Sequence, residues 1–169
     1  GARTEGAVDK PCALFLDTRD DSLPRRVQEA DGSWSLEFDG VDDFANVPCE
    51  VWPTFGGCTL EMEVMPALDR TGRGPLWANF FGLFDLGVEK DGALSASFWQ
   101  FGSGPTPEAR GAKLMPEKWT HIRLVNDAEK IVVWQDGVKT IEFPIQMPAS
   151  NTMGAMIGGF PARDRGFFK

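Results

Sequence analysis

The chain has 169 residues, of which 42% are hydrophobic, so it is long enough to bury the core of one domain. Its formal net charge of −8 argues against nucleic acid, whose phosphates would be repelled, and against a polybasic membrane contact. No apolar run approaches the length of a membrane-spanning helix. An acidic surface is compatible with neutral sugars and cations, or it serves only to keep the domain soluble.

The first third of the chain predicts short strands after a loose start. Residues 1–11 form a lead-in, and residues 13–17 are a short apolar run that predicts a first strand. Residues 20–31 are polar and charged, which predicts a surface loop, with one turn of helix as the alternative. Residues 34–38 alternate apolar and polar side chains, which is typical of a half-buried strand. Residues 44–47 are predicted to continue or pair with it.

The middle of the chain shows the same strand patterning. Residues 59–65 place Leu60, Met62 and Val64 on one face, and Pro66 ends the ladder because it donates no hydrogen bond. Residues 75–88 predict two strands, broken near Gly82 or Asp85. The remaining predictions for this region are a charged loop at 69–74, a tight turn at 90–92, a strand at 93–101 and a Gly/Pro-rich loop at 102–111.

The last third contains the clearest hairpin. Residues 131–135 and 138–143 flank Asp136-Gly137, a pair that accepts the positive φ angles of a tight turn. Strands are also predicted at 119–125 and 153–157. Many short strands between turn signals, with hardly any helical periodicity, predict an all-β sandwich or barrel.

Five landmarks occur in an order that resembles one superfamily. They are Phe38-Asp39-Gly40-Val41-Asp42-Asp43, then Thr59-Leu60-Glu61 with Pro66, then Lys118-Trp119-Thr120-His121, Trp134-Gln135-Asp136-Gly137, and Ile157-Gly158-Gly159. This series is similar to that of laminin G-like domains in the concanavalin A-like lectin/glucanase superfamily. The resemblance implies a two-sheet antiparallel jelly-roll sandwich over residues 34–169. Residues 1–33 are then a lead-in with a first strand and loop, and the whole is one domain.

One landmark of the resembled family is missing. In that family a phenylalanine-x-glycine motif leads into a last strand, whereas this sequence stops at Lys169. We therefore expect that the final strand is absent, or that another segment fills its place in the sheet. The sequence begins at Gly1 rather than Met, so we expect either a processed amino terminus, whose precursor carried a signal, or a remnant of recombinant expression.

The resemblance also implies a function class. Such domains are often non-catalytic binding modules, secreted or on the cell surface, and joined to other domains of larger proteins. The expected ligand is carbohydrate. The alternatives are a glycoside hydrolase or lyase of the same superfamily, and a structural or protein-interaction domain.

A sugar site needs aromatic platforms for ring faces and polar groups for hydroxyls. The candidate platforms are Trp99, Trp77 and Trp52, and the candidate polar partners are Asn79, Gln100 and Arg110. For each Trp taken alone, a place in the core is the stronger explanation, since a Trp in a sandwich usually lies there. Trp119 and Trp134 are expected in the core because of their positions in the resembled family.

Three carboxylates in one turn, those of Asp39, Asp42 and Asp43, are a candidate calcium site, since Ca²⁺ prefers oxygen ligands in flexible loops. Calcium is also common in the resembled family. The alternative is that Asp39 and Asp42 accept hydrogen bonds from local backbone amides and shape the turn. Zinc is not expected, because the single His121 and three scattered cysteines lack ligand spacing.

Glu61 and Glu63 are the candidate catalytic pair of the hydrolase alternative. They lie on one strand face, about 7 Å apart by strand geometry. The paired carboxylates of a retaining glycosidase are about 5–5.5 Å apart, and those of an inverting one are somewhat farther apart. The alternative is a solvated strand face.

Cys49 and Cys58 flank a short connection and could form a disulfide in an oxidising compartment. The odd count, with Cys12, leaves at least one thiol free or paired between chains.

Overall fold

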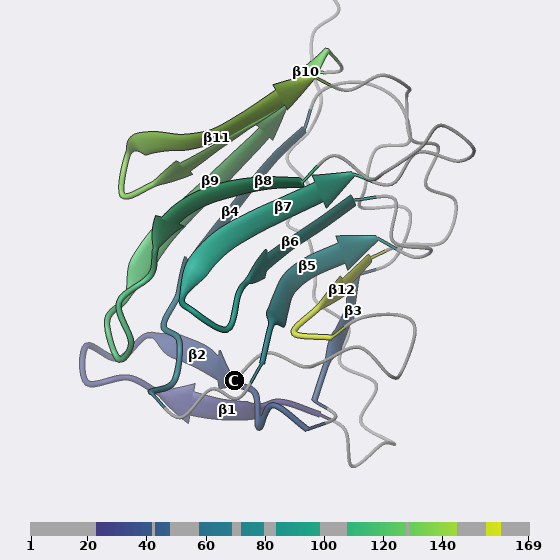
Figure 1. Cartoon of the computed structure of the whole chain (residues 1–169). Helices are drawn as coiled ribbons and strands as arrows, with labels where there is room; N and C mark the ends of the chain where they lie inside the picture. The colour runs from purple at the N-terminus through teal and green to yellow at the C-terminus, as the bar shows by residue number, and fades with distance from the viewer. Residues whose placement is uncertain are drawn as a thin grey trace, which may run out of the picture.

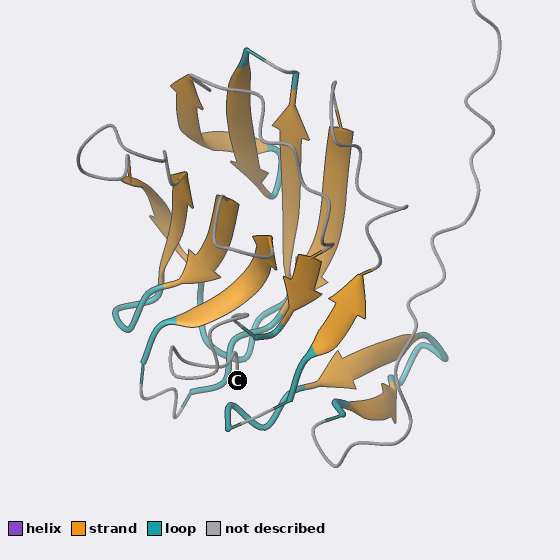
Figure 2. Ribbon diagram, turned by 90° about the vertical axis from the view of Figure 1, so that its right-hand side faces the viewer, coloured by secondary structure: helices purple, strands orange, loops and turns teal. Residues whose placement is uncertain are grey.

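A computed structural model of the chain shows an all-β protein (Figures 1 and 2). It describes residues 23–41, 43–47, 58–68, 72–79, 84–98, 108–127, 129–144 and 155–159. No helix occurs within these ranges. Among them, therefore, no helix is long and apolar enough to cross a membrane.

Twelve strands are formed by the described residues. In chain order they are β1 (Arg25–Gln28), β2 (Trp34–Glu37), β3 (Ala45–Val47), β4 (Cys58–Val64), β5 (Gly74–Asn79), β6 (Phe84–Val88), β7 (Ala93–Phe98), β8 (Glu108–Lys113), β9 (Thr120–Asn126), β10 (Lys130–Gln135), β11 (Val138–Pro144) and β12 (Ala155–Ile157). A six-stranded sheet has the order β3-β12-β5-β6-β7-β8, and a four-stranded sheet has the order β11-β10-β9-β4. Strands β1 and β2 form a separate hairpin, at the lower edge of Figure 1.

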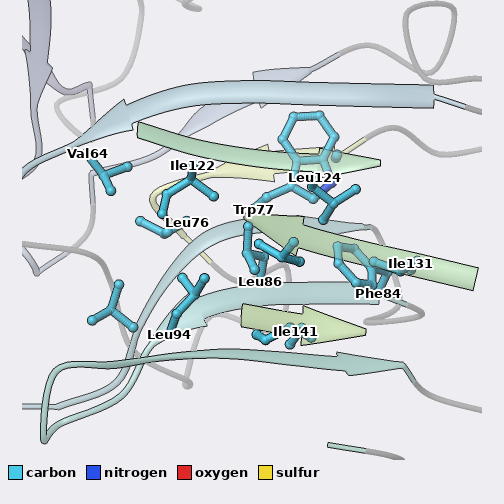
Figure 3. Packing of buried hydrophobic residues seen from close by; sticks show 14 of the residues in the cluster. Val64, Leu76, Trp77, Phe84, Leu86, Leu94, Ile122, Leu124, Ile131 and Ile141 are labelled. Carbon is cyan, nitrogen blue, oxygen red and sulfur yellow. The ribbon is translucent and has the colours of Figure 1, made fainter. Parts of the chain in front are cut away.

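All paired strands run antiparallel, and the two larger sheets pack face to face as a sandwich. The core lies between them and is filled from both sides (Figure 3). Leu86 and Leu94 come from the six-stranded sheet, and Ile122, Leu124 and Val133 come from the four-stranded sheet. Each of these five is at most 1% exposed, which is the dense packing that gives a sandwich its stability. The predicted jelly-roll sandwich is confirmed.

Two of the sequence landmarks meet in space. Gly158 has a φ of +80°, a left-handed conformation that favours glycine, and the ring of Phe38 packs directly over it. A Cβ at Gly158 would overlap that ring more closely than real side chains ever approach. Because Phe38 also packs against the core, this contact fastens the end of β2 to the end of β12.

Two further landmarks are joined by hydrogen bonds. The Asp136-Gly137 turn links β10 to β11, with φ angles of +49° and +79°, as the predicted hairpin requires. Asp136 N–H donates to the His121 carbonyl at 2.8 Å, and Asp136 Oδ1 accepts from His121 N–H at 2.9 Å. The hairpin turn is thereby anchored to β9, the neighbouring strand.

Gln135 ties the two sheets together at one side of the sandwich. Its Oε1 accepts from Ala112 N–H at 3.0 Å, and its Nε2 donates to the Ala112 carbonyl at 3.2 Å. The amide thus replaces a missing strand partner for β8, which is an edge strand of the six-stranded sheet. Gly111 leaves room for this contact, since a Cβ there would lie 3.0 Å from both Gln135 Oε1 and Thr140 Oγ1.

Several expectations about strands were wrong. Residues 25–28 form β1 instead of a loop or helical turn, and β8 begins at Glu108, although a loop was expected up to residue 111. Residues 45–47 neither continue nor pair with β2, because they join β12 in another sheet. Strand β5 ends at Asn79 and β6 begins at Phe84, so the alternative break at Asp85 is wrong, whereas the alternative at Gly82 lies outside the described residues. The predicted first strand at 13–17 and the question of a last strand lie outside the described residues.

Candidate functional site

A network of charged and polar side chains lies on the outer face of the six-stranded sheet, away from the core. We call it the outer-face cluster and define it as Arg73, Asp85, Glu89, Ser95 and Arg110. Strand alternation explains the placement: Phe84, Leu86 and Val88 of β6 point into the core, so Asp85 and Gly87 point outward. The registers Gly87↔Ser95 and Ser95↔Arg110 place these three residues in one row across β6, β7 and β8.

Arg73 is the centre of the outer-face cluster. Its Nη1 lies 2.9 Å from Asp85 Oδ2, and its Nε lies 2.7 Å from Glu89 Oε1. Gly87 makes this arrangement possible, since a Cβ there would lie 2.8 Å from Arg73 Nη2 and 2.9 Å from Cζ. A glycine in the middle of a strand therefore lets the guanidinium approach the sheet closely.

Ser95 completes the buried side of the outer-face cluster. Its hydroxyl donates to Glu89 Oε1 at 2.6 Å, and it lies 3.4 Å from both Arg73 Nη2 and the Gly87 carbonyl. Glu89 Oε1 therefore accepts from both Arg73 and Ser95. This shared acceptor fixes the orientation of both donors on the sheet surface.

Asp85 is a buried charge whose partners do not satisfy it. Its side chain is 8% exposed, and its Oδ1 has no hydrogen-bond partner among the described residues. Burial raises the pKa of Asp85 above its ordinary value, even though the Arg73 guanidinium acts in the opposite direction. Burial alone would lower the pKa of Arg73, but the carboxylates of Asp85 and Glu89 raise it. A carboxylate held at such an energetic cost is a frequent mark of a functional site.

The exposed rim of the outer-face cluster is formed by a second ion-pair network. Arg110 Nη2 lies 2.9 Å from Asp91 Oδ1, and Lys113 Nζ lies 3.7 Å from Asp91 Oδ2. The Arg110 side chain is 52% exposed, whereas those of Arg73 and Glu89 are 30% and 22% exposed. The outer-face cluster thus grades from a buried floor at Asp85 and Ser95 to an exposed edge at Arg110. It presents fixed acceptors beside fixed donors, which is the pairing that sugar hydroxyls require.

The predicted sugar-site residues have different outcomes. Arg110 lies on the outer face, beside Ser95. Trp77 is only 3% exposed and belongs to the core, so it offers no platform. A register shift between Pro75 and Trp77 turns both Leu76 and Trp77 toward the core. Trp52, Trp99 and Gln100 lie outside the described residues, as does the side chain of Asn79.

The expectation that Trp119 and Trp134 lie in the core was also inaccurate. Trp119 precedes β9 and is 40% exposed. Trp134 is half-buried, with the Arg123 guanidinium 5.8 Å from its ring centroid. Both therefore face solvent in part, and neither is in the core cluster.

The acidic turn after β2 is shaped by its own carboxylates. Asp39 Oδ1 accepts from Val41 N–H at 2.7 Å and lies 3.4 Å from Asp43 N, while Asp43 Oδ2 accepts from Asp39 N–H at 2.8 Å. Asp39 therefore has the turn-shaping role that the alternative predicted, and the second residue seen in that role is Asp43 rather than the predicted Asp42. Among the described residues, no group of three or more His, Cys, Asp or Glu side chains could hold a metal ion. Asp42 is not among them, so calcium stays a prediction.

Glu61 and Glu63 lie on the solvent face of β4, as the alternation predicted. Strand β4 is the edge of the four-stranded sheet, and Glu61 Oε1 lies 3.3 Å from Arg123 Nε. An exposed, ion-paired carboxylate on an edge strand fits the solvated-face alternative better than a cleft.

Cys12, Cys49 and the side chain of Cys58 lie outside the described residues, so their redox state stays a prediction.

Sequence reasoning missed the centre of the outer-face cluster. Arg73 was assigned to a charged loop, and Asp85 was treated as a possible strand break. One signal was available: Asp85 is the only charged residue in the apolar run from 75 to 88. A single charge inside such a run must be paired or functional when the run is buried.

Neither a family model nor a curated protein matches the sequence. Solved structures do match in fold. Domains LG4-5 of the mouse laminin alpha1 chain match with a TM-score of 0.56 and 16% identity, over 90% of this chain and 39% of that one. The carbohydrate-binding module CBM66 from Bacillus subtilis matches with a TM-score of 0.51 and 14% identity, over 79% of this chain and 83% of that one.

A third similar structure is described as a putative carbohydrate binding protein from Bacteroides ovatus. It matches with a TM-score of 0.50 and 19% identity, over 68% of this chain. The chain spans about a third of that protein's length, with 35% of it covered. At such identities the likeness concerns the fold alone. The chain has the concanavalin A-like jelly-roll fold that laminin G domains and carbohydrate-binding modules share.

Proposed function

We propose that this chain is a non-catalytic carbohydrate-binding module that holds its sugar at the outer-face cluster. The observation that carries the proposal is the network around Arg73, with its buried Asp85 and its exposed edge at Arg110. A sugar hydroxyl both donates and accepts, so it matches a surface where carboxylates alternate with guanidinium groups. The fold supports the proposal only in that two similar structures are described as carbohydrate binding.

The ligand approaches from the exposed side of the outer-face cluster. Arg110 and Glu89 contact the sugar directly, while Asp85 and Ser95 hold Arg73 in place from below. We include Trp99 in this proposal as the platform for a sugar ring. The sequence alternation that puts Ser95 and Ser97 on one face of the strand assigns Trp99 to the same face. The module acts outside the cytoplasm, alone or as part of a larger protein.

The test is to measure sugar affinity in matched arginine variants. A glycan array identifies a binding sugar, and calorimetry then compares Arg110→Ala with Arg123→Ala. The two side chains are equally exposed, at 52%, and each is ion-paired to an acidic residue, but they lie on different sheets. We expect Arg110→Ala to weaken binding by about tenfold, the loss of one charge-assisted hydrogen bond, and Arg123→Ala to leave it unchanged. Equal effects, or no binding glycan, would contradict the proposal.

A second candidate function is protein binding, and one feature favours it. Four large apolar side chains are exposed on two loops, which we call the loop patch: Met65, Leu68, Met115 and Trp119. The loops run side by side, since Glu117 N–H donates to the Pro66 carbonyl at 2.9 Å. Exposed apolar patches of this kind often mark interaction sites. Glycan binding that survives Trp119→Ser favours the outer-face cluster, and the absence of any glycan ligand favours the loop patch.

A further inference from the structure

The β1–β2 hairpin presents an exposed face that the outer-face cluster does not involve. Its register, Arg26↔Leu36 and Gln28↔Trp34, places these four side chains on one face of the two-stranded ribbon. Arg25, Val27, Ser35 and Glu37 occupy the opposite face. Trp34 is 56% exposed, the most exposed aromatic side chain among the described residues.

Arg26 is stacked on Trp34 in a way that leaves its hydrogen-bond donors available. The guanidinium carbon lies 4.4 Å from the centroid of the ring. Stacking engages the flat face of a guanidinium, whereas its N–H groups lie in the plane and point outward. Among the described residues, no carboxylate forms an ion pair with Arg26. Its neighbour Arg25, on the opposite face, is paired with Glu37.

The acidic groups of the hairpin are engaged elsewhere. Glu37 is paired with Arg25, and the Glu29 carboxylate accepts a hydrogen bond from the Ser35 hydroxyl, on the opposite face. Asp31 Oδ1 accepts from Ser33 N–H at 2.9 Å within the turn. The rest of the chain's negative charge is screened beyond about 8 Å at physiological salt. Arg26 is therefore a fixed cation with open donors beside an exposed indole ring.

We propose that the Arg26–Trp34 face is a second sugar subsite, specific for a pyranose that carries a carboxylate. The guanidinium edge binds the carboxylate through two parallel N–H···O bonds, a geometry that lysine cannot offer. The apolar face of the sugar ring packs on the exposed part of the indole, and the Gln28 amide lies on the same face within reach of hydroxyls. This inference rests on the proposed function, because it supposes that the ligand is a glycan.

The experiment uses the whole chain and three soluble probes. An oligogalacturonate and 3′-sialyllactose supply the two sources of a pyranose carboxylate. The methyl ester of the same oligogalacturonate keeps the rings but removes the charge. Binding is followed by tryptophan fluorescence and by the NMR signal of the Trp34 indole N–H. We expect at least one acid to bind, and the esterified oligomer to bind at least tenfold more weakly than the free acid.

Matched variants separate the stacked arginine from general charge. Arg26→Gln should weaken binding of the acid at least tenfold, while Arg25→Gln, which removes the same charge from the opposite face, should change it less than twofold. Trp34→Ala should abolish binding, and Trp34→Phe should retain part of it. Since Arg26 and Trp34 are exposed, unfolding temperatures should confirm that each variant stays folded.

Equal losses in Arg25→Gln and Arg26→Gln, or equal affinity for acid and ester, would overturn this inference, as would failure of both acids to bind at millimolar concentration. The outcome is separable from that of the proposed function. Arg110→Ala should affect glycans bound at the outer-face cluster and leave acid binding at the hairpin unchanged. Acid binding that depends on Arg26, with no glycan dependent on Arg110, would support the hairpin subsite and reject the outer-face cluster.

Discussion

Replacing Gly158 with Ala tests whether the contact between the ends of β2 and β12 holds the sandwich together. The substitution has two costs. An L-residue at a φ of +80° costs about 1–2 kcal/mol, and the lower entropy of the unfolded chain returns about 0.4–1 kcal/mol of that. The added Cβ must also displace the Phe38 ring from the core, and such overpacking costs about 1–3 kcal/mol. We expect Gly158→Ala to lower the free energy of unfolding by about 3 kcal/mol.

Gly137 supplies the matched control. Its φ of +79° is nearly the same, but a Cβ there would meet nothing within 4 Å. Gly137→Ala should therefore cost only about 1 kcal/mol, the backbone part alone. Urea unfolding of both variants, followed by circular dichroism, measures the difference. In a Phe38→Ala background the cost of Gly158→Ala should fall to that of Gly137→Ala. Equal costs for the two glycines in the wild-type background would refute the steric argument.

Three further predictions concern the sheets and the acidic turn. Burial raises the pKa of Asp85 in the folded state above its ordinary value of 3.8. The free energy of unfolding of the wild type should therefore fall as the pH rises from 3.8 through the pKa of the folded state. Asp85→Asn should remove this component, as parallel pH series of urea midpoints would reveal; identical pH profiles would count against it. Gln135→Leu should destabilise by about 2 kcal/mol, because it removes both hydrogen bonds to Ala112. Faster hydrogen exchange at the Ala112 amide should accompany that loss, and unchanged exchange would argue against the bridge. Calcium at the acidic turn can be tested by its effect on the unfolding temperature. A rise on adding Ca²⁺ that chelator abolishes would assign the turn to the metal, whereas no rise would leave Asp39 and Asp43 with the turn-shaping role alone.

The fold could be predicted where local chemistry and tertiary structure agree. The Asp136-Gly137 hairpin and the alternation in β4 were correct, because turn geometry and half-burial both leave a pattern in the sequence. Strand β1 was missed because three of its four residues are charged or polar, and β8 because its charged residues alternate with Ala and Gly rather than with large apolar side chains. Each is held by pairing with a neighbour, and β8 also by the Gln135 amide, which no local pattern encodes.

The candidate site was harder to predict than the fold. Arg110 was selected for its residue type, but its place beside Ser95 depends on a strand that the sequence did not reveal. Trp77 was wrongly assigned because a bulge in β5 reverses the direction that simple alternation gives. Arg73 reaches Asp85 and Glu89 only because Gly87 lacks a side chain. Contacts of this kind depend on three strands meeting, which spacing along one strand cannot show.

The most direct test of the central claim is an NMR titration of the isotope-labelled chain with a glycan identified on the array. If the outer-face cluster binds sugar, the backbone signals of Arg73, Glu89, Ser95 and Arg110 should shift together and saturate with a single affinity. Signals of β4 and β9, on the other sheet, should stay in place. Shifts confined to the loop patch, or to the solvent face of β4 around Glu61, would contradict the account.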